Sequence, residues 1–150
     1  MNRFERTDFM SKNKTKFKYV GIKITDKRIK EDLHFTLEFF GKEKTTEEVI
    51  NIINNIPLGQ DVGVKITQIG FYNNTNIAYK IDLSQSPIKK YFKGKIPHIT
   101  IKVMNNGKAV DSWKCFTDEG IAIDLIKSEW LYGVYGYFDY NNNFYTEPIK

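Results

Sequence analysis

The sequence predicts an α+β domain in which two or three helices cover a sheet of about six to eight strands. Several short segments alternate apolar and polar residues, one longer segment repeats apolar residues at helical spacing, and no glycine-rich phosphate loop or internal repeat is present. The 150 residues, 41% of them hydrophobic and 15% aromatic, suffice for one core but hardly for two. We therefore expect one domain over residues 1–150, with residues 1–15 flexible.

Three elements are predicted in the first part of the chain. Residues 17–24, "FKYVGIKI", and residues 33–40, "LHFTLEFF", alternate apolar and polar positions, which is typical of strands. Residues 45–56 are the clearest helix. Thr45 or Thr46 can cap this helix, two glutamates occupy its first turn, and its apolar residues recur every three or four positions.

The middle of the chain predicts a hairpin followed by smaller elements. Residues 62–72 and 76–83 are two strands joined by the turn-like "NNTN". Residues 86–92 are a short helix with a proline in its first turn, and residues 98–103 are a strand. Residues 107–116 are a further helical segment, supported by a weaker pattern.

The last part of the chain returns to strand patterns. Residues 121–133 and 134–140 are predicted as two separate strands, because apolar and aromatic residues dominate both. Residues 141–150 close the chain with a turn and an edge strand. Strands and helices thus mix along the chain, as an α+β fold requires.

Composition excludes several classes of protein. No apolar run reaches the roughly 18 residues of a membrane span, and the charged start "MNRFERTDFM" lacks the apolar stretch of a secretory signal. We therefore expect a cytoplasmic protein with no membrane partner and no obligatory protein partner. The net charge of +5, from 23 basic and 18 acidic residues, weakly favours a polyanionic ligand, and a solvated basic face explains it equally well.

A metal or disulfide framework is not expected. Cys115 is the only cysteine, which excludes an internal disulfide, and it is interpreted as a half-buried residue rather than a nucleophile because no histidine is near it in sequence. One cysteine and two histidines do not make a structural zinc site. The acidic residues Glu31, Asp32 and Glu38 are not spaced to join the histidines around a divalent ion. We predict no metal and no cofactor.

Both histidines of the chain occur in the same pattern, His-x-Thr. His34 and Thr36 form the first pair and His98 and Thr100 the second, each inside a predicted strand. Residues two apart in a strand share a face, so each pair projects together while its apolar neighbours point the other way. One such pair is an ordinary surface feature, but two pairs that use every histidine are not. If the two strands are neighbours, two imidazoles and two hydroxyls meet.

That set of groups suits the cleavage of a phosphodiester. A neutral imidazole takes a proton from the attacking hydroxyl or water, while a protonated imidazole gives one to the leaving oxygen. Threonine hydroxyls donate hydrogen bonds to the phosphate oxygens as negative charge grows on them. The predicted catalytic residues are therefore His34, Thr36, His98 and Thr100, and their chemistry requires no metal.

The segments "LHFTLEFFG" and "PHITI", with a helix that starts "TEE" between them, resemble the two-histidine (2H) phosphoesterase superfamily. In that family the first motif is commonly followed by Phe-x-Gly or Leu-Gly, and the second is often preceded by proline, as by Pro97 here. A late hydrophobic strand that ends in serine is matched by "IAIDLIKSEW". The resemblance spans roughly residues 17–140. The segment "SQSPIKKYFKGK" departs from the family, because many members have a longer helix there.

The resemblance implies two lobes of antiparallel sheet related by a pseudo-twofold axis, with helices outside and an active-site groove between the lobes. It also implies a metal-independent phosphodiesterase. Members open 2′,3′-cyclic phosphates on RNA ends, trim RNA tails or hydrolyse 2′,5′-linked oligoadenylates, and viral members degrade cyclic di- or trinucleotide signals of host defence. We favour a viral or phage enzyme that degrades a cyclic or 2′,5′-linked oligonucleotide immune signal in the host cytoplasm. Hydrolysis of 2′,3′-cyclic phosphates on RNA ends is the close alternative.

A nucleotide substrate needs aromatic faces for its bases and cations for its phosphates. The predicted substrate-binding residues are Tyr19, Lys23, Phe40, Lys102, Trp130 and Tyr137. Further candidates of the same kinds are Tyr72, Lys95, Trp113 and Tyr132. Core packing of the aromatic residues and solvation of the lysines are the alternative interpretations. A non-catalytic module that binds single-stranded RNA on the same surface is the second class of function.

Overall fold

The computed structural model describes residues 17–150. Its strands are β1 (Phe17–Ile24), β2 (His34–Phe39), β3 (Asp61–Tyr72), β4 (Asn76–Ile81), β5 (His98–Val103), β6 (Ile121–Asp139) and β7 (Phe144–Tyr145). Its helices are α2 (Thr46–Asn55) and the 3-10 helices η1 (Pro87–Tyr91) and η2 (Ala109–Phe116). The strands form one antiparallel sheet in the order β1-β2-β5-β4-β3-β6-β7.

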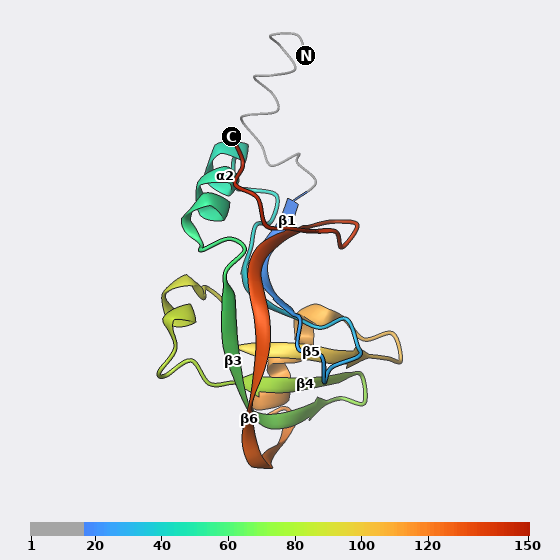
Figure 1. Ribbon diagram of the computed structural model, residues 1–150. Coiled ribbons are helices and arrows are strands. Elements are labelled where there is room, and N and C mark those ends of the chain that lie inside the picture. The colour runs from blue at the N-terminus through green and yellow to red at the C-terminus, as the bar shows by residue number, and fades with distance from the viewer. Residues whose placement is uncertain (1–16) are drawn as a thin grey trace.

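The sheet closes on itself because β6 reaches both of its sides. This strand is 19 residues long; residues 121–134 pair with β3, and residues 133–139 pair with β1. The pairing of β6 with β1 closes the strands β1, β2, β5, β4, β3 and β6 into a ring of six. A strand of this length can serve both neighbours because the right-handed twist of the sheet carries it around the barrel. Figure 1 shows β3 and β6 side by side, with β4 and β5 crossing them.

The prediction of a two-lobed α+β fold with a pseudo-twofold axis is wrong. The two strands predicted at residues 121–133 and 134–140 are one continuous strand, β6, which ends at Asp139 and pairs with both β3 and β1. The strands β2 and β5 are hydrogen-bonded to each other where a groove between lobes was expected. The fold is instead a mostly-β, six-stranded antiparallel closed barrel with short helices.

One core unites the interior of the barrel with α2. Phe35 and Ile99 have none of their surface exposed, and Ile53 of α2 belongs to the same cluster. The helix begins as predicted: the Thr45 hydroxyl accepts a hydrogen bond from the Glu48 amide, and the Glu48 carboxylate accepts one from the Thr45 amide, each at 3.1 Å. This capping box fixes the first turn of α2 at the point where the chain leaves β2.

The other elements lie close to their predicted positions. The strands predicted at residues 17–24 and 98–103 have those bounds, and the predicted hairpin is formed by β3 and β4. The segments predicted as helical at residues 86–92 and 107–116 contain 3-10 helices. The edge strand expected at the end of the chain is β7, which pairs with Tyr137 and Phe138 of β6.

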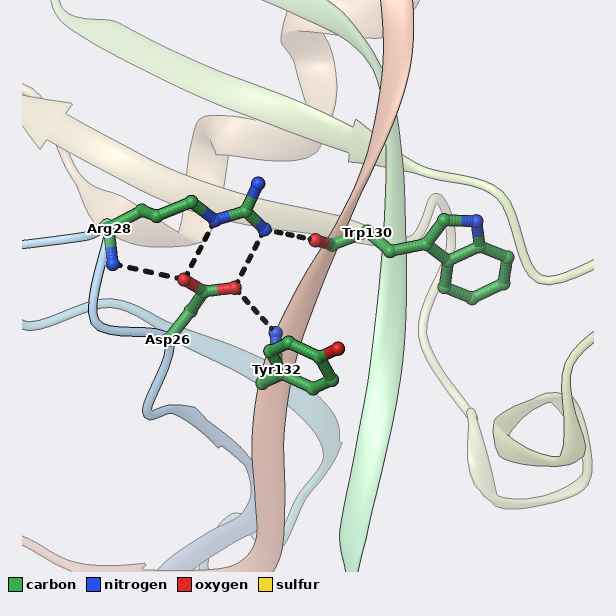
Figure 2. Close-up of polar contacts among 4 residues, drawn as sticks. All are labelled: Asp26, Arg28, Trp130 and Tyr132. Carbon is green, nitrogen blue, oxygen red and sulfur yellow. Dashed lines mark hydrogen bonds and ion pairs between the residues drawn. The ribbon is translucent and has the colours of Figure 1, made fainter.

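Hydrogen bonds made by two side chains of the β1–β2 loop fix the chain just before β2. Arg28 donates to both carboxylate oxygens of Asp26, at 3.0 and 2.8 Å, and the Tyr132 amide donates to the same carboxylate at 3.1 Å (Figure 2). Arg28 also donates to the carbonyl of Trp130. The hydrogen bonds from Arg28 and Tyr132 hold the pKa of Asp26 well below its usual range. The loop is thereby tied to β6, and β2 starts at His34.

Three remaining predictions concern the cysteine, the membrane and the start of the chain. Cys115 is fully buried rather than half-buried, and burial raises the pKa of its thiol to about 11, which leaves it unreactive at neutral pH. Within residues 17–150, no helix is long and apolar enough to cross a membrane. The flexibility expected for residues 1–15 lies outside the described residues.

Candidate active site

The two His-x-Thr motifs lie side by side on β2 and β5. Phe35 pairs with Ile99 in antiparallel register, and both side chains point into the core. Side chains alternate between the faces of a strand, so the histidines and threonines project from the outer face of the barrel. All four are half-buried. We refer to them as the two-histidine face: His34, Thr36, His98 and Thr100.

The register within this face pairs each histidine with a threonine. Extending the antiparallel pairing by one residue in either direction places His34 opposite Thr100 and Thr36 opposite His98. Directly opposite residues have Cβ atoms about 4.5–5.5 Å apart. The two imidazoles therefore lie diagonally across the face, with a hydroxyl beside each.

Each histidine is paired with a lysine on the strand that flanks the β2–β5 pair. Lys23 of β1 pairs with His34, and Lys80 of β4 pairs with His98. Cross-strand partners share a face, so both lysines project from the outer face on the strands that flank the motifs. The Lys23 Nζ lies 5.7 Å from the centre of the Phe144 ring. Lys23 was predicted from the sequence as a substrate-binding residue. Lys80 was missed, because only the pairing of β4 with β5 shows which lysine of the hairpin lies beside His98.

His34 is enclosed by two aromatic rings. Its imidazole stacks on Tyr19 at 5.1 Å between ring centroids and lies 5.3 Å from Phe138, and both of these aromatic residues are buried. The pKa of His34 is lowered to about 4, mainly by burial; the negative charge of Asp32 opposes this shift, and the positive charges of Lys18 and His98 add to it. His34 is therefore neutral at pH 7.

His98 is oriented by the backbone just before β5. Its Nδ1 lies 2.7 Å from the carbonyl oxygen of Ile96. A carbonyl only accepts, so Nδ1 carries the proton and Nε2 is left to exchange protons with a ligand. Burial lowers the pKa of His98, while the Ile96 carbonyl raises it by favouring the charged ring. Burial has the larger effect, so the pKa of His98 lies below the ordinary value of a histidine side chain.

Thr100 is hydrogen-bonded to Ser112 of η2, which is itself hydrogen-bonded to Asn76 of β4. Its hydroxyl lies 2.9 Å from the Ser112 hydroxyl, and Ser112 accepts from the Asn76 amide at 3.0 Å. Asn76 and Ser112 are both buried. The Ser112 hydroxyl thus accepts from both Asn76 and Thr100, and the lone pairs of the Thr100 oxygen are left for a ligand. No sequence pattern indicated Ser112, since η2 reaches Thr100 only through the tertiary fold.

The remaining predicted substrate-binding residues are not gathered at this face. Phe40 and Tyr137 are core residues, and the Tyr137 hydroxyl donates to the Glu147 carbonyl at 2.7 Å. Tyr19 is buried against His34, so its ring shapes the histidine pocket and has no free face for a base. Lys102 is exposed on β5, two residues beyond Thr100, and the register between β4 and β5 shifts between these two residues.

Trp130 is exposed but lies elsewhere on the barrel. It projects beside Gly63 on the β3–β6 pair, which the strand order separates from the β2–β5 pair by β1 on one side and β4 on the other. A cavity of about 230 Å³ also lies away from the motifs, next to α2, and is lined by residues that include Ile52, Asn55, Tyr91 and Lys93. None of the four residues of the two-histidine face lines it.

Metal-ligating side chains do not gather in the described part of the chain. Within residues 17–150, no group of three or more histidine, cysteine, aspartate or glutamate side chains is placed to hold a metal ion. The groups available at the two-histidine face are imidazoles, hydroxyls and lysines, which suit an anionic ligand rather than a cation.

Comparison of the chain with models of known protein families, and with characterised proteins, finds no match.

The burial of His34 predicts a loss of stability in acid. Its folded-state pKa of about 4 lies below the ordinary 6.5, so the unfolded chain binds the proton more readily. The free energy of unfolding is therefore expected to fall by about 3 kcal/mol as the pH decreases from above 6.5 to about 4. Urea titrations at pH 7 and pH 4 measure it. His34→Gln, which cannot titrate, is expected to remove most of the difference, and an equal acid loss in this variant would contradict the assignment.

Proposed function

We propose that the chain is a phosphodiesterase that hydrolyses a nucleotide phosphodiester by acid–base catalysis with two histidines. The observation that supports this most strongly is the pairing of β2 with β5, which brings two imidazoles and two hydroxyls onto one face between two lysines. A surface that only bound an anion would need the lysines and hydroxyls, but not two half-buried histidines whose pKa values are lowered.

The two histidines differ in the way that a base and an acid should. His34 has the more strongly lowered pKa and is neutral over the widest range of pH, so it is assigned as the base that takes a proton from the attacking water or hydroxyl. His98 keeps a hydrogen bond to the Ile96 carbonyl that favours its charged form, so it is assigned as the acid that protonates the leaving oxygen.

The transition state gains negative charge on the non-bridging phosphate oxygens. Thr36 would donate a hydrogen bond to these oxygens, Thr100 would do so by turning its hydroxyl away from Ser112, and Lys23 and Lys80 would supply positive charge from the flanking strands. A new bond forms between phosphorus and the attacking oxygen, and the bond to the leaving oxygen breaks as His98 protonates it. After this step His34 is protonated and His98 is neutral, and proton exchange with water returns both to their starting states.

The substrate class is proposed from the resemblance to the two-histidine phosphoesterases and from the net charge of +5. We propose a cyclic or 2′,5′-linked oligonucleotide that serves as an immune signal, which the chain would degrade. A 2′,3′-cyclic phosphate on an RNA end is the second candidate, because the same two proton transfers open it. The diagonal arrangement of the two histidines fits a substrate that crosses the face in either direction. It therefore does not select between the two linkages.

The test is hydrolysis by the purified protein in excess EDTA. The panel consists of cyclic dinucleotides, cyclic trinucleotides, 2′,5′-oligoadenylate and RNA ending in a 2′,3′-cyclic phosphate, with products identified by chromatography and mass spectrometry. We expect cleavage of one class, undiminished by EDTA. Tight binding without cleavage of any member would instead favour a module that binds single-stranded RNA.

A further inference from the structure

A tryptophan and a lysine contact each other where η2 lies against β5, outside the set of groups used above. The hydrogen bond between Ser112 and Thr100 holds η2 against β5, and Trp113 follows Ser112 directly. Lys95, three residues before His98, places its Nζ 4.2 Å from the centre of the Trp113 ring. Two independent contacts therefore bring the Trp113 indole and the Lys95 ammonium to the η2 side of the two-histidine face.

The chemistry of this pair matches the two parts of a nucleotide. The indole is half-buried, so it is held in place and still offers part of its surface, and an indole is the best ring for stacking on a base or a cation. Lys95 is exposed, and within residues 17–150 it forms no ion pair with a carboxylate. Its charge is thus available to a phosphate while its position is restrained by the ring.

The second tryptophan provides an internal comparison. Trp130 is more exposed, yet it lies beside Gly63 on the β3–β6 pair. Its cross-strand neighbour, Lys65, is engaged with Asp82 at 3.8 Å. An indole with accessible surface is therefore present at both places, but of the two only Trp113 contacts a lysine that forms no ion pair and lies on a helix held against β5.

We infer that Trp113 and Lys95 form a nucleotide subsite, in which the indole stacks on the base next to the scissile phosphate and Lys95 binds a phosphate of the same ligand. The inference rests on the proposed function for the position of the scissile phosphate. It makes the η2 side of the face the side that selects for a base, whereas the lysines of β1 and β4 contact only phosphate. A ligand with phosphate but without a base is then bound without stacking.

Fluorescence separates the two tryptophans. The variant Trp130→Phe leaves Trp113 as the only indole, and Trp113→Phe leaves Trp130; both are made with His34→Ala to stop turnover during titration. The probes, all in EDTA, are a 2′,5′-linked adenosine dinucleotide, a cyclic diadenylate and ribose 5-phosphate. We expect either dinucleotide to quench Trp113, ribose 5-phosphate to compete without quenching, and Trp130 to remain unchanged. Lys95→Gln is expected to weaken binding several-fold, and Trp113→Ala roughly five- to a hundredfold.

The outcomes distinguish this subsite from the proposed reaction. If neither dinucleotide quenches Trp113, or if Trp130 is quenched instead, the subsite is wrong. Hydrolysis of the panel by the protein with His34 intact is measured in parallel. Cleavage without a response of Trp113 would overturn the subsite and leave the proposed function in place, whereas quenching of Trp113 without cleavage would keep the subsite and reject the reaction.

Discussion

Replacing either histidine by alanine is expected to lower phosphodiester hydrolysis by at least about a hundredfold, because general acid or base catalysis contributes roughly 10²–10⁴ in rate. His34 and His98 lie on neighbouring strands of one face, and each is assigned one of the two proton transfers. Loss of either transfer stalls the same step, so the double variant should be little slower than the worse single variant. The measurement is kcat/KM on the cleaved panel member, with substrate binding followed separately.

A matched control keeps this prediction specific. Lys127→Ala removes an exposed positive charge from β6, outside the two-histidine face, and should leave hydrolysis unchanged. Binding should persist in both histidine variants, since Lys23, Lys80 and the threonines remain. If His34→Ala and His98→Ala both retain full turnover, the histidines are not catalytic.

Truncation of Phe35 is expected to cost about 3–5 kcal/mol of unfolding free energy, the usual range for a buried phenylalanine replaced by alanine. Phe35 has none of its surface exposed, pairs with Ile99 across β2 and β5, and lies 5.6 Å from the Phe92 ring. The cavity left by Phe35→Ala opens directly beneath the two-histidine face. Urea or guanidinium unfolding, compared with the parent protein, measures the loss.

Phe39→Ala is the control for this second prediction. Phe39 lies on the same strand but is 54% exposed, so its truncation should change the unfolding free energy by no more than about 0.5 kcal/mol. Equal losses in the two variants would mean that Phe35 does not face the core. The assignment of the histidines to the opposite face of β2 would then fail with it.

Alternation along single strands made the motif residues predictable. Each His-x-Thr alternates with apolar neighbours, and a period of two assigns faces without any knowledge of the partner strand. The helix at residues 46–55 was equally local, because Thr45 and Glu48 form its capping box within four residues. These features depend only on neighbours in sequence, and the structure places them as predicted.

Closure of the barrel was not local in this sense. Nothing in "IAIDLIKSEWLYGVYGYFDY" distinguishes two strands from one strand of 19 residues that pairs with β3 and then with β1. The lobes were inferred from a resemblance, and the β1–β6 and β2–β5 pairings contradict them. The roles of Lys80 and Ser112 were hidden for the same reason, since each reaches the motif only through a partner strand or helix.

Aromatic residues show a further limit of sequence patterns. Tyr19 and Tyr137 alternate with apolar residues and were predicted to stack on bases, yet one encloses His34 and the other lies in the core. Alternation assigns a side chain to a face but does not tell which face a neighbouring ring covers. Trp113, by contrast, belongs to a short 3-10 helix whose contact with β5 depends on the Ser112–Thr100 hydrogen bond.

The pH dependence of kcat/KM in EDTA tests the central claim most directly. Catalysis needs His34 neutral and His98 charged, so the rate should rise as the pH increases through about 4, where His34 loses its proton. It should fall again as His98 loses its proton, at a pH below 6.5, because burial lowers the pKa of His98. We predict a bell-shaped profile with its maximum between these limits. Absence of hydrolysis, or a rate that does not change between pH 4 and pH 8, would contradict catalysis by the two histidines.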